Sequence, residues 1–251
     1  MSFSNQMIFC VDDNIECVTI IPKLNLNQGD ENLSYYVRLM HQEDAAQVTE
    51  IDREAFPTQL PPPNYQHELR NRLAHYIVAC DEEKTVAQPE MTATSEKGMT
   101  GPPSRLRRLF SRNRSFNNEL STLSRHYVTG FTGFWVMADE AHITTIAVRE
   151  AYRLEGIGEL LLISLIGLAT ELKAHFITLE VRASNTAAQS LYAKYGFIQV
   201  GVRPGYYLDD REDAVLMSTQ DITLAEFQAH LQQLKQVHAR KWGITLYQIV
   251  R

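Results

Sequence analysis

Hydrophobic residues recur along this 251-residue chain with two different periods, and the changes of period outline its secondary structure. Segments in which apolar and polar residues alternate, or in which β-branched residues cluster, predict strands. Segments with apolar residues three and four positions apart predict helices. The predicted strands cover residues 35–40, 74–81, 127–137, 142–148, 175–183, 197–203 and 213–218. The predicted helices cover residues 45–56, 64–73, 157–173, 186–195 and 223–243.

This order of elements predicts an α/β fold with a mixed central sheet of about six or seven strands, flanked by helices. Residues 35–218 form the predicted domain, with an N-terminal extension at 1–34 and a long basic insertion at about 84–126. Residues 219–251 form a C-terminal helical extension, which we expect to pack on the domain or on a partner. Its predicted capping box is Thr223 with Glu226, and its apolar stripe is Phe227, Leu231, Leu234 and Val237.

Composition narrows the possible functions. The formal net charge of −6 argues against bulk binding of nucleic acid, which is usually the task of a basic domain. The three cysteines lack metal-ligand spacing, so no metal site is expected, and His142 and His175 are expected at strand boundaries. The chain starts without the basic and apolar regions of a signal peptide, and its longest apolar run is too short to span a bilayer. We therefore expect a cytoplasmic protein without a membrane partner.

The insertion at residues 84–126 has few large apolar residues, and arginines cluster near its centre. They are Arg105, Arg107, Arg108, Arg112 and Arg114. A solvated, flexible loop explains this composition. The alternative is an arm that contacts RNA, a ribosome or another acidic surface, because clustered arginines neutralise phosphates. The sequence leaves both interpretations open.

Two glycines, Gly156 and Gly158, stand where a strongly apolar helix begins. Glycine in a helix costs about 1 kcal/mol relative to alanine, so the pair needs a reason. A tight strand-to-helix turn is one reason. The other is that backbone N–H groups close on an anion, assisted by the positive end of the helix dipole. The turn matches neither common nucleotide motif, since Leu161 replaces the third glycine of a dinucleotide fingerprint and Gly-Lys-Ser/Thr is absent from the sequence.

Longer segments around this turn carry a family resemblance. HITTIAVREAYRLEGIGELLL, LEVRASNTAAQSLYAKYGF and GVRPGYYLDDREDAVLM together resemble the GNAT N-acetyltransferases, most of all the RimI-type enzymes that acetylate protein N-terminal amines. The resemblance covers about residues 35–218 and is absent from the insertion. It implies the GNAT fold, acetyl-CoA as acyl donor, and a turn that cradles the pyrophosphate of acetyl-CoA. The residues of that turn are Arg153, Leu154, Glu155, Gly156, Ile157 and Gly158. Family members usually carry basic residues or glycine where Leu154 and Glu155 stand, which bears on the affinity for CoA.

Two residues are candidates for proton transfer. Alternation along its strand places Glu180 on the same face as Thr178 and Arg182. Taken alone, Glu180 suits a solvated face and Tyr192 suits the core. The resemblance implies instead that Glu180 is the general base and that Tyr192 protonates the CoA thiolate. It also implies that Asn185, which equally fits a helix cap, contacts CoA. In the family, pantetheine pairs with the backbone at the positions of Ile146, Ala147 and Val148, where one N–H would polarise the acetyl carbonyl.

The acceptor implied by the resemblance is the α-amine of a protein, for example a ribosomal protein. Arg203, Tyr206 and Tyr207 lie in the loop that walls the acceptor groove in RimI-type enzymes, although packing at a hairpin edge also explains them. An α-amine has a pKa near 7.8 and lysine one near 10.4, so their neutral fractions at pH 7 differ by a factor of roughly 400. Lysine side chains, polyamines or other small amines are alternative acceptors. A non-catalytic acyl-CoA-binding or RNA-associated module is the alternative of another class, and the presence of both Glu180 and Tyr192 argues against it.

Overall fold

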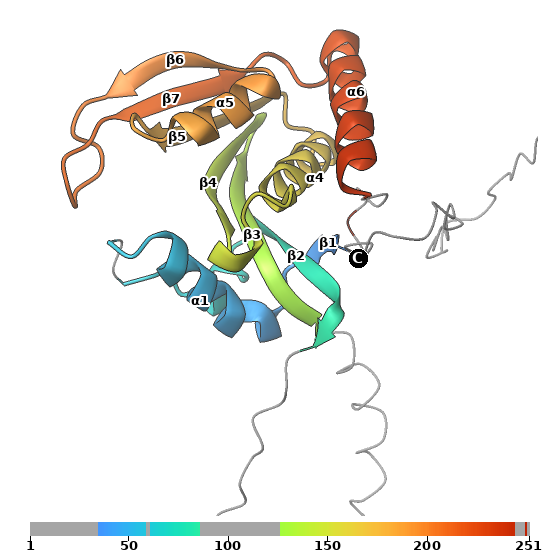
Figure 1. Ribbon diagram of the computed structural model, residues 1–251. Helices are drawn as coiled ribbons and strands as arrows, with labels where there is room; N and C mark the ends of the chain where they lie inside the picture. The colour runs from blue at the N-terminus through green and yellow to red at the C-terminus, as the bar shows by residue number, and fades with distance from the viewer. Residues whose placement is uncertain (1–34, 59–60, 86–125, 244–248, 250–251) are drawn as a thin grey trace, which may run out of the picture. The chain divides into compact units, whose positions relative to one another are not determined.

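The computed structural model describes residues 35–58, 61–85, 126–243 and 249, which all belong to one unit, Asn32–Arg251 (Figure 1). Its strands form a seven-stranded sheet in the order β1-β2-β3-β4-β5-β7-β6. They are β1 (Tyr35–Leu39), β2 (Ala74–Thr85), β3 (His126–Met137), β4 (Glu140–Val148), β5 (Phe176–Arg182), β6 (Phe197–Arg203) and β7 (Ala214–Thr219). Within this sheet β4 and β5 pair in parallel and all other neighbours are antiparallel. The predicted mixed α/β fold is confirmed.

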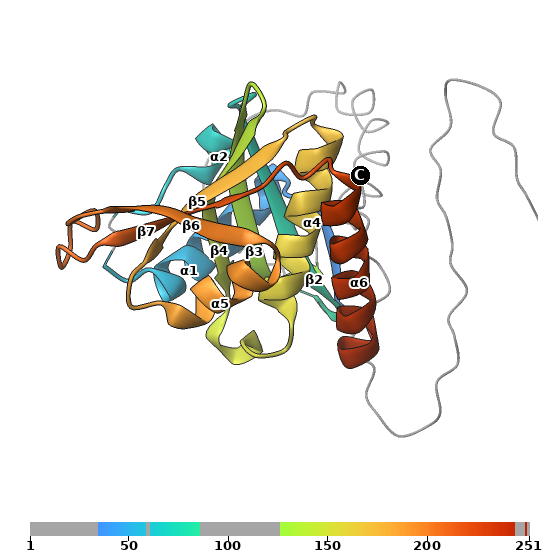
Figure 2. The same cartoon turned by 90° about the horizontal axis from the view of Figure 1, so that it is seen from above.

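Helices cover both faces of the sheet (Figures 1 and 2). On one face, α1 (Ala45–Ala55) and the short α2 (Tyr65–Glu68) enclose a core that includes Val48, Ile51 and Phe131. On the other face, α4 (Ile157–Glu171), α5 (Thr186–Lys194) and α6 (Ala225–Trp242) lie over a larger core. The short 3-10 helices η1 (Gln42–Asp44) and η3 (Glu150–Tyr152) precede α1 and α4. The sequence predicted a much longer helix at the position of α2.

The long apolar run predicted as a buried helix is α4. Its residues from Leu160 to Leu165 are all buried, because the helix is enclosed between the sheet and the surrounding elements. Among the described helices, none combines the length and the apolar composition needed to cross a membrane.

Two helix-end predictions have opposite outcomes. Asn185 caps α5, since its side chain accepts a hydrogen bond from the Ala188 N–H at 3.1 Å, and Gly196 follows that helix with φ of +86°. Both predictions are confirmed. The capping box predicted for α6 is wrong, because Thr223 bonds Asp221 instead. The apolar stripe is also shifted. Leu231 is buried as expected, whereas Val237 is 52% exposed and its neighbour His238 is buried.

The predicted insertion begins and ends at one end of a hairpin. β2 ends at Thr85, β3 begins at His126, and these two residues are paired. The arginines at positions 105–114, most of the insertion and residues 1–34 lie outside the described residues.

Candidate active site

The sheet opens between its two parallel strands. β4 and β5 are paired over residues 140–143 and 176–179, and the last pair is Ile143 with Leu179. A register shift in the β3–β4 ladder, between Gly133 and Phe134, leaves Thr144 as an extra residue at the same level. Beyond it, in the described part of the sheet, the backbone of β4 pairs with β3 alone. This stretch contains Ile146, Ala147 and Val148. An extended ligand can therefore add to β4 in the middle of the sheet.

Glu180 is the first residue of β5 beyond those that pair with β4. One carboxylate oxygen lies 3.1 Å from His142 Nε2, and the other lies 3.2 Å from a terminal nitrogen of Arg203. The side chain is only 10% exposed. Its face of the strand is the predicted one, but the carboxylate is held between two polar partners rather than on a solvated face.

His142 extends the contacts of Glu180 into a chain. Its Nδ1 lies 2.9 Å from Thr178 Oγ1, and the Thr178 hydroxyl donates to the carboxylate of Glu140. Because that hydroxyl proton is committed to Glu140, Thr178 accepts from Nδ1–H of His142. A hydrogen bond between Nε2 and the Glu180 carboxylate then needs a proton on one of these two groups. His142 is the third residue of β4, so the expectation that it marks a strand boundary is wrong.

Tyr192 lies on the opposite side of the opening. It projects from α5 and packs with the core beneath α4, with its ring 5.6 Å from that of Phe197. Burial raises the pKa of Tyr192 to about 12. The phenol therefore keeps its proton near neutral pH. Glu180 faces the α1 side of the sheet, because Ile177, Leu179 and Val181 of the same strand are buried in the core on the α4 side.

The turn before α4 has an unusual backbone. Leu154 has φ of +67° and Gly156 has φ of +80°, whereas the φ of Gly158 is not positive. A Cβ at Gly158 would meet only Val148 Cγ2, at an ordinary 3.8 Å. Neither strain nor crowding within the described protein explains Gly158. The first N–H groups of a helix have no intrahelical partners, so this turn is suited to an anion that approaches closely.

Leu154 and Glu155, the two residues of the turn that depart from the family pattern, have different surroundings. The Tyr35 hydroxyl of β1 donates to Glu155 Oε2 at 2.5 Å, which ties this carboxylate to the first strand. The pKa of Tyr35 is raised mainly by burial and, to a smaller extent, by this hydrogen bond. Leu154 is 94% exposed and the structure gives no reason for it. Arg153 is also exposed, and its Nε lies 3.4 Å from the Val148 carbonyl.

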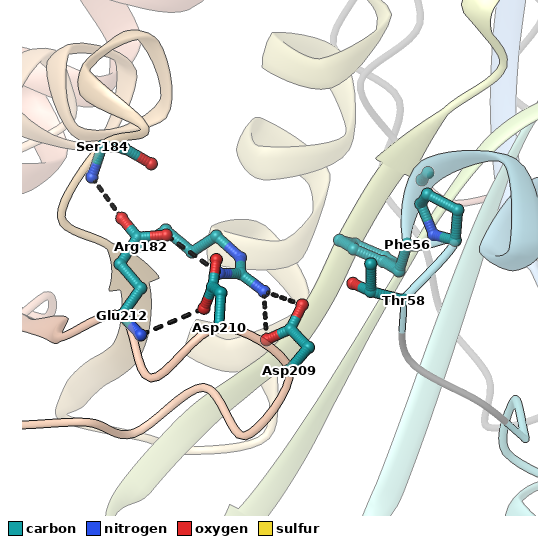
Figure 3. A pocket seen from close by; sticks show the side chains of 9 residues that line it. Phe56, Thr58, Arg182, Ser184, Asp209, Asp210 and Glu212 are labelled. Atoms are coloured by element: carbon teal, nitrogen blue, oxygen red, sulfur yellow. Dashed lines mark hydrogen bonds and ion pairs between the residues drawn. The ribbon is translucent and has the colours of Figure 1, made fainter.

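A cavity of about 340 Å³ lies beside Arg182, which shares with Glu180 the face of β5 on the α1 side (Figure 3). Its lining residues come from the end of α1, the end of β5 and the β6–β7 loop. They are Ala55, Phe56, Pro57, Thr58, Arg182, Ser184, Asp209, Asp210 and Glu212. Arg182 binds all three carboxylates at 2.6 to 2.8 Å. With three carboxylates and one guanidinium, this wall has an excess of negative charge.

The tyrosines predicted for the acceptor loop support the same wall. The Arg182 guanidinium lies 4.0 Å from the centre of the Tyr207 ring, and burial is the main cause that raises the pKa of Tyr207 to about 12. The Arg203 guanidinium lies 5.6 Å from the ring of Tyr206, which is 42% exposed. Arg203 therefore connects this loop to Glu180.

Comparisons with known proteins agree with this geometry. Residues 101–197 match the sequence profile of the Acetyltransferase (GNAT) family. A Bacillus subtilis protein, provisionally named a ribosomal protein bS18-alanine N-acetyltransferase, is 32% identical over 182 residues, or 72% of this chain and 92% of that protein. The chain belongs to the GNAT acetyltransferase family. The ribosomal protein bS18-alanine N-acetyltransferase of Escherichia coli K12 is 42% identical over 85 residues, covering 33% of this chain and 57% of that enzyme. The crystal structure of the ribosomal-protein-S18-alanine N-acetyltransferase from Escherichia coli shares the fold, with a TM-score of 0.51 and 22% identity. The match covers 74% of this chain and 94% of that chain.

In this acetyltransferase, the structure brings some predicted residues together and adds others. Glu180 and Arg203 are in contact, and Tyr192 stands on the other side of the strand opening. His142 and Arg182 are additions to the predicted site. The parallel register that sets His142 opposite Thr178 leaves no local pattern in the sequence. The charged sequence DDRE in the β6–β7 loop indicates that a cation lies nearby, but the sequence alone does not show that this cation is Arg182.

Proposed function

We propose that this GNAT acetyltransferase transfers the acetyl group of acetyl-CoA to the α-amine at the N-terminus of a protein. The proposal depends most on the carboxylate of Glu180, which lies where β4 and β5 separate and contacts His142 and Arg203. The names of the Bacillus subtilis and Escherichia coli relatives support an N-terminal alanine of a ribosomal protein as the acceptor.

On the donor side, residues 153–158 bind the pyrophosphate through backbone N–H groups and Arg153. The unpaired edge of β4 at Ile146, Ala147 and Val148 pairs with pantetheine, and one of its N–H groups polarises the acetyl carbonyl. Asn185 contacts CoA near the start of α5. The hydrogen bond from Tyr35 to Glu155 supports this assignment, because it holds the only carboxylate of residues 153–158 against β1.

On the acceptor side, the amine enters through the cavity beside Arg182. Because the wall formed by Asp209, Asp210 and Glu212 carries excess negative charge, it attracts the cationic form of an amine. Tyr206 and Tyr207 hold the loop that carries this wall. The acceptor then has to lose a proton before it can attack.

Glu180 takes that proton, and His142 Nε2 can accept it in turn. The amine nitrogen attacks the thioester carbon, so a C–N bond forms and the C–S bond breaks. Tyr192 donates its hydroxyl proton to the departing sulfur and regains one from solvent. An amine that enters as the ammonium ion gives up two protons, one before the attack and one from its nitrogen after the C–N bond has formed. The CoA sulfur receives one proton and solvent receives the other, so the exchange balances.

Other assignments remain predictions. Contact of the arginines at positions 105–114 with RNA or a ribosome rests on composition alone. We place the enzyme in the cytoplasm, where newly made N-termini and acetyl-CoA meet.

Two matched peptides test the acceptor at about pH 7.5, where about a third of an α-amine but only about 0.1% of a lysine is neutral. One has a free N-terminal alanine and no lysine, and the other has a blocked N-terminus and one lysine. We expect turnover of the first alone. Turnover of the second alone would contradict the proposal and identify a lysine acetyltransferase. Acetyl-CoA binding without turnover of either peptide would direct attention to small amines.

A further inference from the structure

The C-terminal helix α6 packs against the turn that begins α4. α6 lies alongside α4 in both views (Figures 1 and 2). Its buried residues are Leu231 and His238, which are seven positions apart and so lie on one side of the helix. The last residue of α6, Trp242, is partly buried and packs with the same core. The proposed pyrophosphate turn is thus in contact with a helix outside the predicted domain.

Both contacts of α6 with the turn converge on Gly156. His238 Nε2 lies 3.0 Å from the Gly156 carbonyl oxygen. A carbonyl only accepts, so Nε2 carries the proton, and burial lowers the pKa of His238, which favours the neutral ring. The indole of Trp242 fills the space that a side chain at residue 156 would occupy. Three of its ring atoms lie 2.6 to 2.7 Å from where a Cβ of residue 156 would be. Gly156 therefore needs to be glycine both for its φ of +80° and for its contact with Trp242.

A separate set of contacts attaches the first half of α6 to α5. His230 Nε2 lies 3.0 Å from the Lys194 carbonyl, and the ring of Phe227 lies against Gly196. The first half of α6 is thus secured without contact with the turn. This division matters because it provides a matched control. His230 and His238 each bond one backbone carbonyl from the same helix.

We infer that His238 and Trp242 are positioning residues of the acetyl-CoA site, which hold residues 153–158 in the conformation that aims their N–H groups at the pyrophosphate. The inference rests on the proposed function, since it takes this turn as the pyrophosphate site. Without these contacts, Leu154 and Gly156 can leave their left-handed conformations, which are unfavourable for leucine in particular. The indole Nε1 of Trp242 is buried without an acceptor among the described residues, so Trp242 is held there by its shape.

Loss of the contacts made by His238 and Trp242 should weaken the binding of acetyl-CoA and leave the acetyl-transfer step unchanged. In the proposed site, the turn binds the diphosphate, whereas Glu180 and Tyr192 carry out the proton transfers. We therefore expect His238→Leu, which loses one hydrogen bond, to raise the Kd for CoA and the KM for acetyl-CoA by about tenfold. Trp242→Ala, which loses the packing on Gly156, should raise both constants as well. kcat and the KM for the peptide should stay within about twofold. His238→Gln keeps a donor in place of Nε2 and should restore wild-type behaviour.

The experiment measures CoA affinity by calorimetry and acetyl-CoA kinetics with the alanine peptide, for His238→Leu, His238→Gln, Trp242→Ala and the control His230→Leu. The control loses the same kind of hydrogen bond and should keep a wild-type KM for acetyl-CoA. If His238→Leu does not fold, Trp242→Phe tests the other contact with Gly156, since it places a smaller ring there. An unchanged KM in the folded variants, or an equal rise in His230→Leu, would overturn the inference while leaving the proposed function intact. A wild-type protein that binds no CoA would remove both.

Discussion

Gly158 gives the sharpest test of the anion site, because the protein itself does not require glycine there. It is the second residue of α4, its φ is not positive, and a Cβ would meet only Val148 Cγ2 at 3.8 Å. We predict that Gly158→Asp leaves the fold intact and weakens CoA binding by at least about 30-fold, whereas Gly158→Asn, of nearly the same size, binds CoA much more tightly than Gly158→Asp. Asp places a fixed negative charge where the pyrophosphate should lie.

Gly158→Asp should stabilise the fold and weaken CoA binding, and the size of both effects can be estimated. Replacing glycine in a helix recovers part of about 1 kcal/mol, and a carboxylate in the first turn gains about 0.3 to 1 kcal/mol from the helix dipole. Gly158→Asp should therefore raise the free energy of unfolding by up to about 1 kcal/mol, or the Tm by about 2 to 4 °C. Two charges at about 4 Å repel by about 1 kcal/mol even at the dielectric constant of water. A diphosphate with two charges then loses at least about 2 kcal/mol, or about 30-fold in Kd.

The assay combines thermal melting with calorimetric titration of CoA at low salt. Gly167→Asp is the matched control, since Gly167 lies in the same helix and a Cβ there would have no neighbour within 4 Å. It should bind CoA as the wild type does. Equal CoA affinities of Gly158→Asp and Gly158→Asn would refute the reasoning, because charge at the helix start would then have no effect. A lower Tm for Gly158→Asn would show that the glycine serves the fold after all.

Three further predictions concern the chemistry and the insertion. Glu180→Gln should lower kcat by about 10²- to 10⁴-fold with little change in Kd for CoA, and an unchanged kcat would exclude it as the base. Tyr192→Phe should likewise lower kcat alone, and because burial raises the pKa of Tyr192 to about 12, the wild-type kcat should not fall between about pH 8 and 10. A falling limb in that range that disappears in Tyr192→Phe would contradict this assignment. Since Thr85 and His126 are paired, replacing residues 90–122 by a short linker should preserve acetylation of the alanine peptide, and a loss of turnover would give the insertion a role in catalysis.

Local patterns in the sequence predicted much of the fold and part of the site. The alternation around Glu180 predicted its face correctly, since each strand neighbour of the opposite parity is buried. Asn185 and Gly196 marked the ends of α5 because capping depends on residues within one or two turns. These features are encoded within short windows, where one sequence suffices.

Contacts between distant segments could not be read in this way. Tyr35 and Glu155 are 120 positions apart, and His142 meets Glu180 only through the register of two parallel strands. In α6 the apolar pattern favoured Val237 over His238, and the reverse is observed. A buried histidine is stable there because the Gly156 carbonyl accepts its N–H, and that carbonyl belongs to a turn 82 positions away.

The arrangement of the site also bears on which amine it suits. Tyr192 and the turn before α4 lie on one side of the sheet, and Glu180 with the acidic cavity lies on the other. The donor and the acceptor can therefore approach from opposite faces and meet where β4 and β5 separate. A carboxylate is a modest base, and the acidic wall favours the charged form of any amine that enters. A lysine would remain almost wholly protonated under these conditions, whereas an α-amine has a neutral fraction roughly 400 times larger at pH 7. The combination of a carboxylate base with an acidic entrance thus favours the amine that is easiest to deprotonate, which is the N-terminal one.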